Sequence, residues 1–309
     1  MRPLSRVFPR SSVVGLAILS LLMFGSASAQ DMGEAKFVDV DGIRTRYFEA
    51  GSGEILVLVH GGGFGQTSGA EGWSSIFGGL AQHFHVYAFD KLGMGETDLP
   101  KSDADYTMAA TIRHAYGFMQ KLGIQKANLA GLSRGALPVA RLAVDHPELV
   151  TNLILFDSST LSPEDPATPI DWYERQYELN PPNRSPKTQK AFETIERLQS
   201  QFIEKHRDQV EKDPQLKITT SPSPFWIRDT KHETHDLIRA GRLKAPTLII
   251  WGYDDPSAPV VLAPRVMNLI FPVVPRSELH IFNKAPHSVY NAHPEKTVRL
   301  IVDFIKNPS

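Results

Sequence analysis

A serine in a glycine-flanked turn is the first residue of this chain whose setting suggests chemistry. Ser133 lies between Gly131 and Gly135 in a G-x-S-x-G spacing, after the apolar segment 126–132 and before the helical pattern 136–146. A strand, a turn and a helix in this order present a serine hydroxyl as a nucleophile. The turn strains the serine backbone, and a Cβ at either flank would collide with the neighbouring strand and helix. We therefore predict that Ser133 attacks a carbonyl carbon of the substrate.

A glycine-rich loop could stabilise the negative charge that such an attack creates. The unbroken aliphatic segment 55–59 is typical of a strand covered on both faces, and it runs directly into His60-Gly61-Gly62-Gly63-Phe64-Gly65. Glycines allow backbone N–H groups to point at an oxyanion with no side chain in the way. We expect the backbone N–H groups of Gly62 and Arg134 to form this oxyanion hole. A flexible glycine linker is the alternative, which the preceding buried strand disfavours.

These two motifs resemble those of the α/β-hydrolases, and the resemblance extends over about residues 37–305. Within this superfamily the chain resembles the meta-cleavage product hydrolases, which split carbon–carbon bonds in aromatic breakdown products. The segment 90–97, Asp-Lys-Leu-Gly-Met-Gly-Glu-Thr, resembles the D-x-x-G-x-G-x-S segment of the family, where its role is structural. The resemblance implies an α/β-hydrolase fold: a mostly parallel eight-stranded sheet covered by helices on both faces, with an inserted helical cap.

The resemblance also implies the base and the acid that a serine nucleophile needs. The family's G-x-x-D motif corresponds to residues 252–255 and places the acid at Asp255, and its histidine loop places the base at His287. Serine, aspartate and histidine then follow one another in the order expected for this fold. Two aspartates compete for the role of the acid. Asp254 is the immediate neighbour, and Asp157 follows the sixth strand, from which some relatives take their acid.

The expected reaction is acyl transfer, in which His287 takes the proton of the serine and water later releases the acyl group. The carbon–carbon hydrolases carry an asparagine before the nucleophile, a methionine after it and a tryptophan after the histidine, whereas this chain has Leu132, Arg134 and Ser288. The apolar Leu132 and the small Ser288 favour a carboxylic ester or lactone of a small hydrophobic or aromatic substrate, because an ester needs no isomerisation before cleavage. Carbon–carbon hydrolysis is the alternative.

Other functions are also alternatives. Epoxide hydrolases and haloalkane dehalogenases use an aspartate nucleophile, so Ser133 argues against both. A cofactor-free haloperoxidase keeps the same triad of residues. A non-catalytic ligand receptor on a hydrolase scaffold belongs to a different class, and the intact triad argues against it.

The chain around these motifs alternates between strand and helix patterns, which predicts a parallel sheet with helices on both faces. The turn dipeptide Asp41-Gly42 fits a hairpin between the first two strands. The predicted strands are 36–40, 44–48, 55–59, 86–89, 126–132, 149–156, 247–251 and 277–282. The predicted helices are 73–83, 107–122, 136–146, 260–270 and 294–305.

The alternation stops at residues 160–241, where prolines cluster and amphipathic pieces such as 190–206 intervene. We interpret 160–241 as a helical cap over the site, between two parts of the core at 30–159 and 242–309. Aromatic side chains of a cap more often pack against the core than contact a ligand, but some should line the pocket.

Residues 1–29 have the form of a secretory signal peptide. Three arginines precede an apolar run at 13–24, which ends in Ala27-Ser28-Ala29. The run is too short for a membrane span of roughly 20 residues. We therefore expect cleavage after Ala29 and a periplasmic or secreted protein with no stable membrane insertion. An uncleaved anchor is the alternative.

The composition limits the classes of partner that we expect for the protein. Lysines and arginines number 33 against 34 acidic residues, and no basic patch points to nucleic acid. The absence of cysteine excludes disulfides and a thiol nucleophile. His232 and His235 could form a metal pair, but a solvated cap surface is the simpler interpretation. We expect a small-molecule substrate, no metal and no cofactor, and the sequence does not indicate the oligomeric state.

Overall fold

Eight strands form one sheet in the computed structural model, which describes residues 32–163, 184–208 and 224–307. The strand order is β1-β2-β4-β3-β5-β6-β7-β8; β2 is antiparallel to both β1 and β4, and all other neighbours are parallel. The strands are β1 Lys36–Val40, β2 Ile43–Ala50, β3 Ile55–Val59, β4 His85–Phe89, β5 Ala127–Leu132, β6 Val150–Phe156, β7 Thr247–Gly252 and β8 Ser277–Phe282. The predicted sheet is therefore confirmed, including the hairpin at Asp41-Gly42.

The five predicted core helices are confirmed, whereas the helices at 224–239 and 289–292 were not predicted individually. The helices are α1 Ser74–Ala81, α2 Met108–Lys121, α3 Ala136–Asp145, α5 Pro186–Lys205, α8 Pro224–Arg239, α9 Ala263–Ile270, α10 Val289–Ala292 and α11 Pro294–Lys306. Single turns of 3₁₀ helix are η1 Ala70–Trp73, η2 Asp103–Asp105, η3 Ser133–Gly135 and η4 Val260–Leu262. The Thr107 hydroxyl caps α2 by accepting the Ala110 N–H at 3.1 Å, which explains why the helix begins there.

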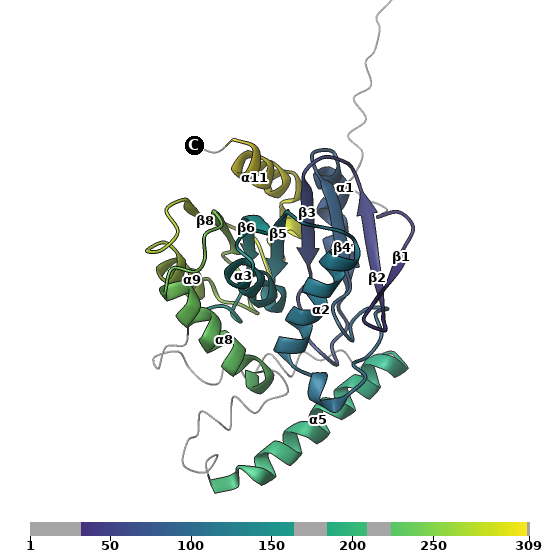
Figure 1. The fold of residues 1–309 in the computed structure, drawn as a ribbon. Coiled ribbons are helices and arrows are strands. Elements are labelled where there is room, and N and C mark those ends of the chain that lie inside the picture. The colour runs from purple at the N-terminus through teal and green to yellow at the C-terminus, as the bar shows by residue number, and fades with distance from the viewer. Residues whose placement is uncertain (1–31, 164–183, 209–223, 308–309) are drawn as a thin grey trace, which may run out of the picture.

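Helices cover both faces of the sheet, as Figure 1 shows. Helices α2, α3, α8 and α9 contact one another in succession on one face, while α1, α10 and α11 form the layer on the other. Strand β3 is apolar throughout because both of its faces are buried. Val57 and Val59 belong to the core under the first layer of helices, and Leu56 and Leu58 belong to the core under the second. The carboxyl ends of the parallel strands thus meet at one edge of a rigid, doubly covered sheet.

The segment expected as a cap contributes two described helices that lie in different places. Helix α5 lies at one end of the core in Figure 1, where Ala191 and Ile195 pack against Tyr106. Helix α8 contacts α3 and α9, and its buried Ile238 belongs to the main core. The second half of α8 thus packs as a core helix, although it falls within the expected cap. Residues 164–183 and 209–223 lie outside the described part of the chain.

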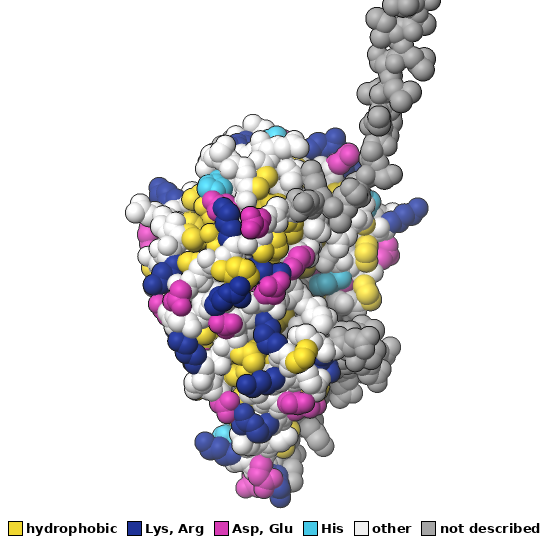
Figure 2. Space-filling view, turned by 90° about the vertical axis from the view of Figure 1, so that its right-hand side faces the viewer, with side chains coloured by type: hydrophobic (Ala, Val, Ile, Leu, Met, Phe, Trp, Pro, Cys, Tyr) yellow, Lys and Arg dark blue, Asp and Glu magenta, His cyan; other side chains and the backbone are white. Residues whose placement is uncertain are grey.

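Charges of both signs intermingle on the surface. On the face drawn in Figure 2, lysines and arginines alternate with acidic side chains around small hydrophobic areas. No helix within the described ranges is both long and apolar enough to cross a lipid bilayer. The expected signal peptide, residues 1–29, falls outside those ranges and stays a prediction.

Candidate active site

The predicted nucleophile occupies a strained turn at the end of β5. Ser133 has φ 52°, in the left-handed region that non-glycine residues rarely adopt. A Cβ on Gly131 would lie 2.4 Å from the carbonyl oxygen of Gly135, and a Cβ on Gly135 would lie 2.2 Å from the carbonyl oxygen of Val59. Both distances are far below van der Waals contact, so the two glycines are needed for the steric reason that the sequence suggested.

The structure pairs the predicted base with the predicted acid. Nδ1 of His287 lies 2.7 Å from Oδ2 of Asp255, whose side chain is fully buried. The second oxygen, Oδ1, accepts the backbone N–H groups of Ser257 at 2.7 Å and Ala258 at 2.8 Å. An ionised carboxylate only accepts hydrogen bonds, so Nδ1 carries the proton and Nε2 is left as the basic nitrogen. Asp254 is exposed and does not take this position.

Asp157, the other rival, lies beside this pair and has a different set of bonds. One ligand atom from each of Asp157, Asp255 and His287 falls within 4.8 Å of the other two. Asp157 accepts the backbone N–H of Gly252 at 2.7 Å and that of Val289 at 3.5 Å. It therefore connects the loop that carries the acid with the loop that carries the histidine. Burial raises the pKa of Asp157 to about 7.

The two carboxyl groups set the basicity of the histidine. Burial lowers the pKa of His287, but the hydrogen bond and the charge of Asp255, together with the charge of Asp157, raise it above its usual value. The raised pKa makes His287 a stronger base. It also keeps the ring protonated at mildly acidic pH, where it cannot take the proton of the serine.

Bonds on the far side of the glycine loop fix the orientation of the predicted oxyanion donor. His60 Nε2 accepts the backbone N–H of Lys91 at 3.0 Å, so Nδ1 carries the proton and donates to the carbonyl oxygen of Gly61 at 2.7 Å. Ser68 Oγ donates to the same oxygen at 3.2 Å. In a trans peptide the N–H points opposite to the carbonyl, so the Gly62 N–H points away from His60. His60 therefore braces this loop between the Gly61 carbonyl and the Lys91 N–H.

The glycine loop also touches the nucleophile and its neighbour. A Cβ on Gly61 would lie 3.2 Å from the Ser133 Cβ, which shows how closely loop and serine approach. The Gly63 N–H donates to Oε1 of Gln66 at 3.0 Å, and Arg134 Nη1 donates to the same oxygen at 3.2 Å. The Gly63 N–H thus forms its hydrogen bond within the loop. Gly62 is the predicted donor to the oxyanion, and the carbonyl of the same peptide, on Gly61, is anchored.

The sequence did not predict the burial of two residues, of which only the first belongs to this site. Lys91 is buried beneath the glycine loop, although its segment suggested only a structural role. The only signal was the position of the lysine, between the apolar segment 86–89 and Leu92. His235 is the second residue: it is buried and its Nε2 lies 2.9 Å from the carbonyl oxygen of Leu161, so the expectation of a solvated surface there is wrong. The amphipathic α8 turns this residue toward the core.

Neither the alternative of a metal pair at His232 and His235 nor the lining of the pocket by cap aromatics is decided by the sequence. The ring centres of His232 and His235 are 6.5 Å apart. Within the described residues, the one group of three or more acidic and histidine side chains close enough to share a metal ion is the Asp157, Asp255 and His287 cluster itself. Several aromatic residues of the expected cap fall where side chains are not described: Trp172, Tyr173, Tyr177, Phe225 and Trp226.

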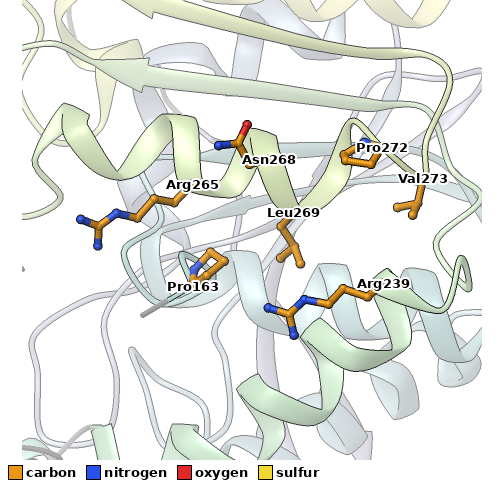
Figure 3. A pocket seen from close by; sticks show the side chains of 7 residues that line it. All are labelled: Pro163, Arg239, Arg265, Asn268, Leu269, Pro272 and Val273. Atoms are coloured by element: carbon orange, nitrogen blue, oxygen red, sulfur yellow. The ribbon is translucent and has the colours of Figure 1, made fainter. Parts of the chain in front are cut away.

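A separate pocket lies between α8 and α9 (Figure 3). Arg239 of α8 and Arg265 and Asn268 of α9 border it, and Leu269 forms part of its apolar wall. None of the candidate catalytic residues lines this pocket, so it is distinct from the site at the sheet edge.

The chain is similar to known proteins over most of its length. The sequence profile described as alpha/beta hydrolase fold matches residues 54–294. The chain is 29% identical over 273 residues to the 2-hydroxy-6-oxo-6-(2'-aminophenyl)hexa-2,4-dienoic acid hydrolase of Metapseudomonas resinovorans, covering 87% of this chain and 90% of that protein. It is 29% identical over 280 residues to the 2-hydroxymuconate semialdehyde hydrolase of Pseudomonas sp. (strain CF600), covering 85% of this chain and 91% of the relative.

A solved structure confirms the same fold. The meta-cleavage product hydrolase from Pseudomonas fluorescens IP01 superimposes with a TM-score of 0.63 at 22% identity, covering 89% of this chain and 98% of that one. The profile spans more than half of the present sequence, and the strand order and the serine turn agree with it. The chain therefore belongs to the alpha/beta hydrolase fold family and is an enzyme of that family.

Proposed function

We propose that this protein is a serine hydrolase that cleaves a carbon–carbon bond in a dienoate of the meta-cleavage product type. The 2.7 Å pairing of His287 with buried Asp255, at the sheet edge where Ser133 is held in its strained turn, is the observation that supports the chemistry. The substrate class rests on relatives whose names describe dienoic acid and semialdehyde hydrolases and whose likeness spans nearly the whole fold.

The proposed reaction begins with the keto form of the substrate. His287 Nε2 removes the proton of the Ser133 hydroxyl, and Oγ attacks the ketone carbon, so a carbon–oxygen bond forms and the carbonyl electrons move onto oxygen. The N–H groups of Gly62 and Arg134 donate hydrogen bonds to this oxyanion. Collapse breaks the carbon–carbon bond, and the departing dienolate takes up the proton held by His287. Water, deprotonated by the same histidine, then hydrolyses the acyl-serine and restores the enzyme.

An ester or lactone is the second candidate substrate, and the sequence alone ranks it first. Leu132 beside the nucleophile is buried and packs near the glycine loop, so it cannot grip an enol or a carboxylate. Ester cleavage uses the same serine, histidine and oxyanion hole but needs no ketonisation. The comparisons favour the carbon–carbon alternative over this reading, since the named relatives are hydrolases of dienoates and a related semialdehyde.

The deciding experiment compares substrates on one enzyme. A 6-aryl-2-hydroxy-6-oxohexa-2,4-dienoate, an aryl ester and a lactone are assayed side by side with the wild type, Ser133→Ala and Ser75→Ala. Ser75 on α1 bonds Asn291 at 2.8 Å and serves as a matched serine control. We expect kcat/KM for the dienoate to exceed that for the ester and the lactone by at least about tenfold, or about 1.4 kcal/mol of transition-state stabilisation.

Two results would contradict this proposal in different ways. A higher kcat/KM for the ester or lactone would assign the enzyme to the second candidate. Turnover that survives Ser133→Ala, measured beside an unaffected Ser75→Ala control, would refute the serine mechanism for both substrates.

A further inference from the structure

A buried lysine lies under the glycine loop. Lys91 is the second residue after β4, and only 2% of its surface is exposed. Its Nζ donates to the carbonyl oxygen of Gly62 at 2.7 Å. Removing an ammonium group from water costs several kcal/mol unless hydrogen bonds or charges offset the loss. A lysine in this position therefore needs a physical reason, and the reaction described above does not yet use it.

The lysine completes the anchoring of the loop on both sides of Gly62. The peptide before this glycine is held through the Gly61 carbonyl, which accepts from His60 and Ser68. The peptide after it is held at both ends, because its oxygen accepts from Lys91 while its N–H, on Gly63, donates to Gln66. Both peptide planes next to Gly62 are therefore fixed, and together they set the direction of its N–H. The φ of 71° that this requires is one that glycine tolerates.

The charges around Lys91 are few and their effects are defined. Burial and, as the smaller effect, the positive charge of Arg134 on η3 together lower the pKa of Lys91 to about 7. His60, on the other side, is kept neutral because burial lowers its pKa to about 3. Asp90 is already engaged by Nε of Arg46 at 2.6 Å and by the Ala70 N–H at 2.7 Å. A negative charge at the oxyanion hole would therefore favour the protonated form of Lys91.

We propose that Lys91 is a positioning residue of the oxyanion hole: its ammonium group holds the Gly62 carbonyl, so that the Gly62 N–H faces the reacting oxygen, and its charge stabilises the oxyanion. This inference rests on the proposed serine mechanism, but not on the identity of the substrate. Lys91 acts through the Gly62 peptide and does not itself touch the substrate.

The rate at which a fluorophosphonate labels Ser133 tests this role, because phosphonylation passes through the same oxyanion hole. The rate is measured from below to above pH 7 for the wild type, Lys91→Met, Lys91→Arg and Lys187→Met. Lys187 is the matched control, since its Nζ donates to the carbonyl oxygens of Met94 at 3.3 Å and Thr97 at 2.7 Å, away from the glycine loop.

The wild-type rate is expected to rise as His287 loses its proton and to fall again as Lys91 loses its own near pH 7. Lys91→Met should label about 10- to 100-fold more slowly at neutral pH, the range expected for a lost charge-assisted hydrogen bond, and should lack the alkaline fall. Lys91→Arg keeps its charge, so it should also lack the alkaline fall but should label faster than Lys91→Met. Lys187→Met should retain the wild-type profile.

Each other outcome counts against a specific step. A folded Lys91→Met protein with the wild-type rate and profile overturns the role of Lys91 while the serine mechanism stands. If Lys91→Met does not fold, a wild-type profile without an alkaline fall overturns it instead. A wild type that is not labelled on Ser133 at any pH refutes the proposed function and this inference together.

Discussion

Replacing Asp255 by asparagine removes one charge from the site and reverses one hydrogen bond. In the wild type, Oδ2 accepts the proton of His287 Nδ1, while Oδ1 accepts the N–H groups of Ser257 and Ala258. The asparagine oxygen should keep the two backbone bonds, because both donors are fixed in the chain. Its NH₂ group then faces Nδ1 of the histidine and can only donate to it.

The magnitude follows from the resulting tautomer. With Nδ1 accepting a bond, the neutral histidine carries its proton on Nε2 and cannot take the proton of the serine. Loss of the orienting carboxylate in a serine triad lowers turnover by about 10³- to 10⁴-fold, or roughly 4 to 5.5 kcal/mol. We expect a loss of this size in kcat/KM for Asp255→Asn at neutral pH, with part of the rate returning in alkali as hydroxide replaces the base.

The assay compares steady-state turnover of the preferred substrate by Asp255→Asn, Asp254→Asn and Asp157→Asn, with thermal unfolding as the check on folding. Asp254 is exposed and its replacement should change kcat/KM by less than about threefold, as expected for a surface site. The assignment of the acid is refuted if folded Asp255→Asn keeps wild-type turnover, or if Asp157→Asn alone removes it.

Two further substitutions and one mass measurement test other features of the protein. Asp157→Asn removes a charge that raises the pKa of His287, so the acid limb of kcat/KM against pH should move to lower pH; an unmoved or raised limb would contradict this. Gly135→Ala should unfold at lower temperature or fail to fold, because its Cβ would lie 2.2 Å from the Val59 carbonyl oxygen, and an unchanged melting temperature would contradict the steric argument. Intact-mass analysis of exported protein should show that residues 1–29 are missing, and their retention would refute the predicted signal peptide.

Local sequence patterns were sufficient to predict the sheet and the serine turn. The strand predicted at 55–59 coincides with β3, because a doubly covered strand must be apolar and short, and its neighbours mark its ends. The flanking glycines of Ser133 were equally informative, since a strained turn leaves no alternative residue. In such segments the structure depends on residues that are adjacent in the sequence, so their types are enough to predict it.

The choice between rival acids and the burial of charged groups required the tertiary structure. Asp157 and Asp255 both follow strands at the same edge of the sheet, and only the fold shows that Asp255 takes the histidine while Asp157 ties two loops together. Lys91 and His235 belong to segments whose local pattern permits exposure, yet the packing of distant elements buries both. Burial and hydrogen-bond partners depend on residues far apart in the chain. The residue spacing within one segment therefore does not predict which groups are buried or what they bind.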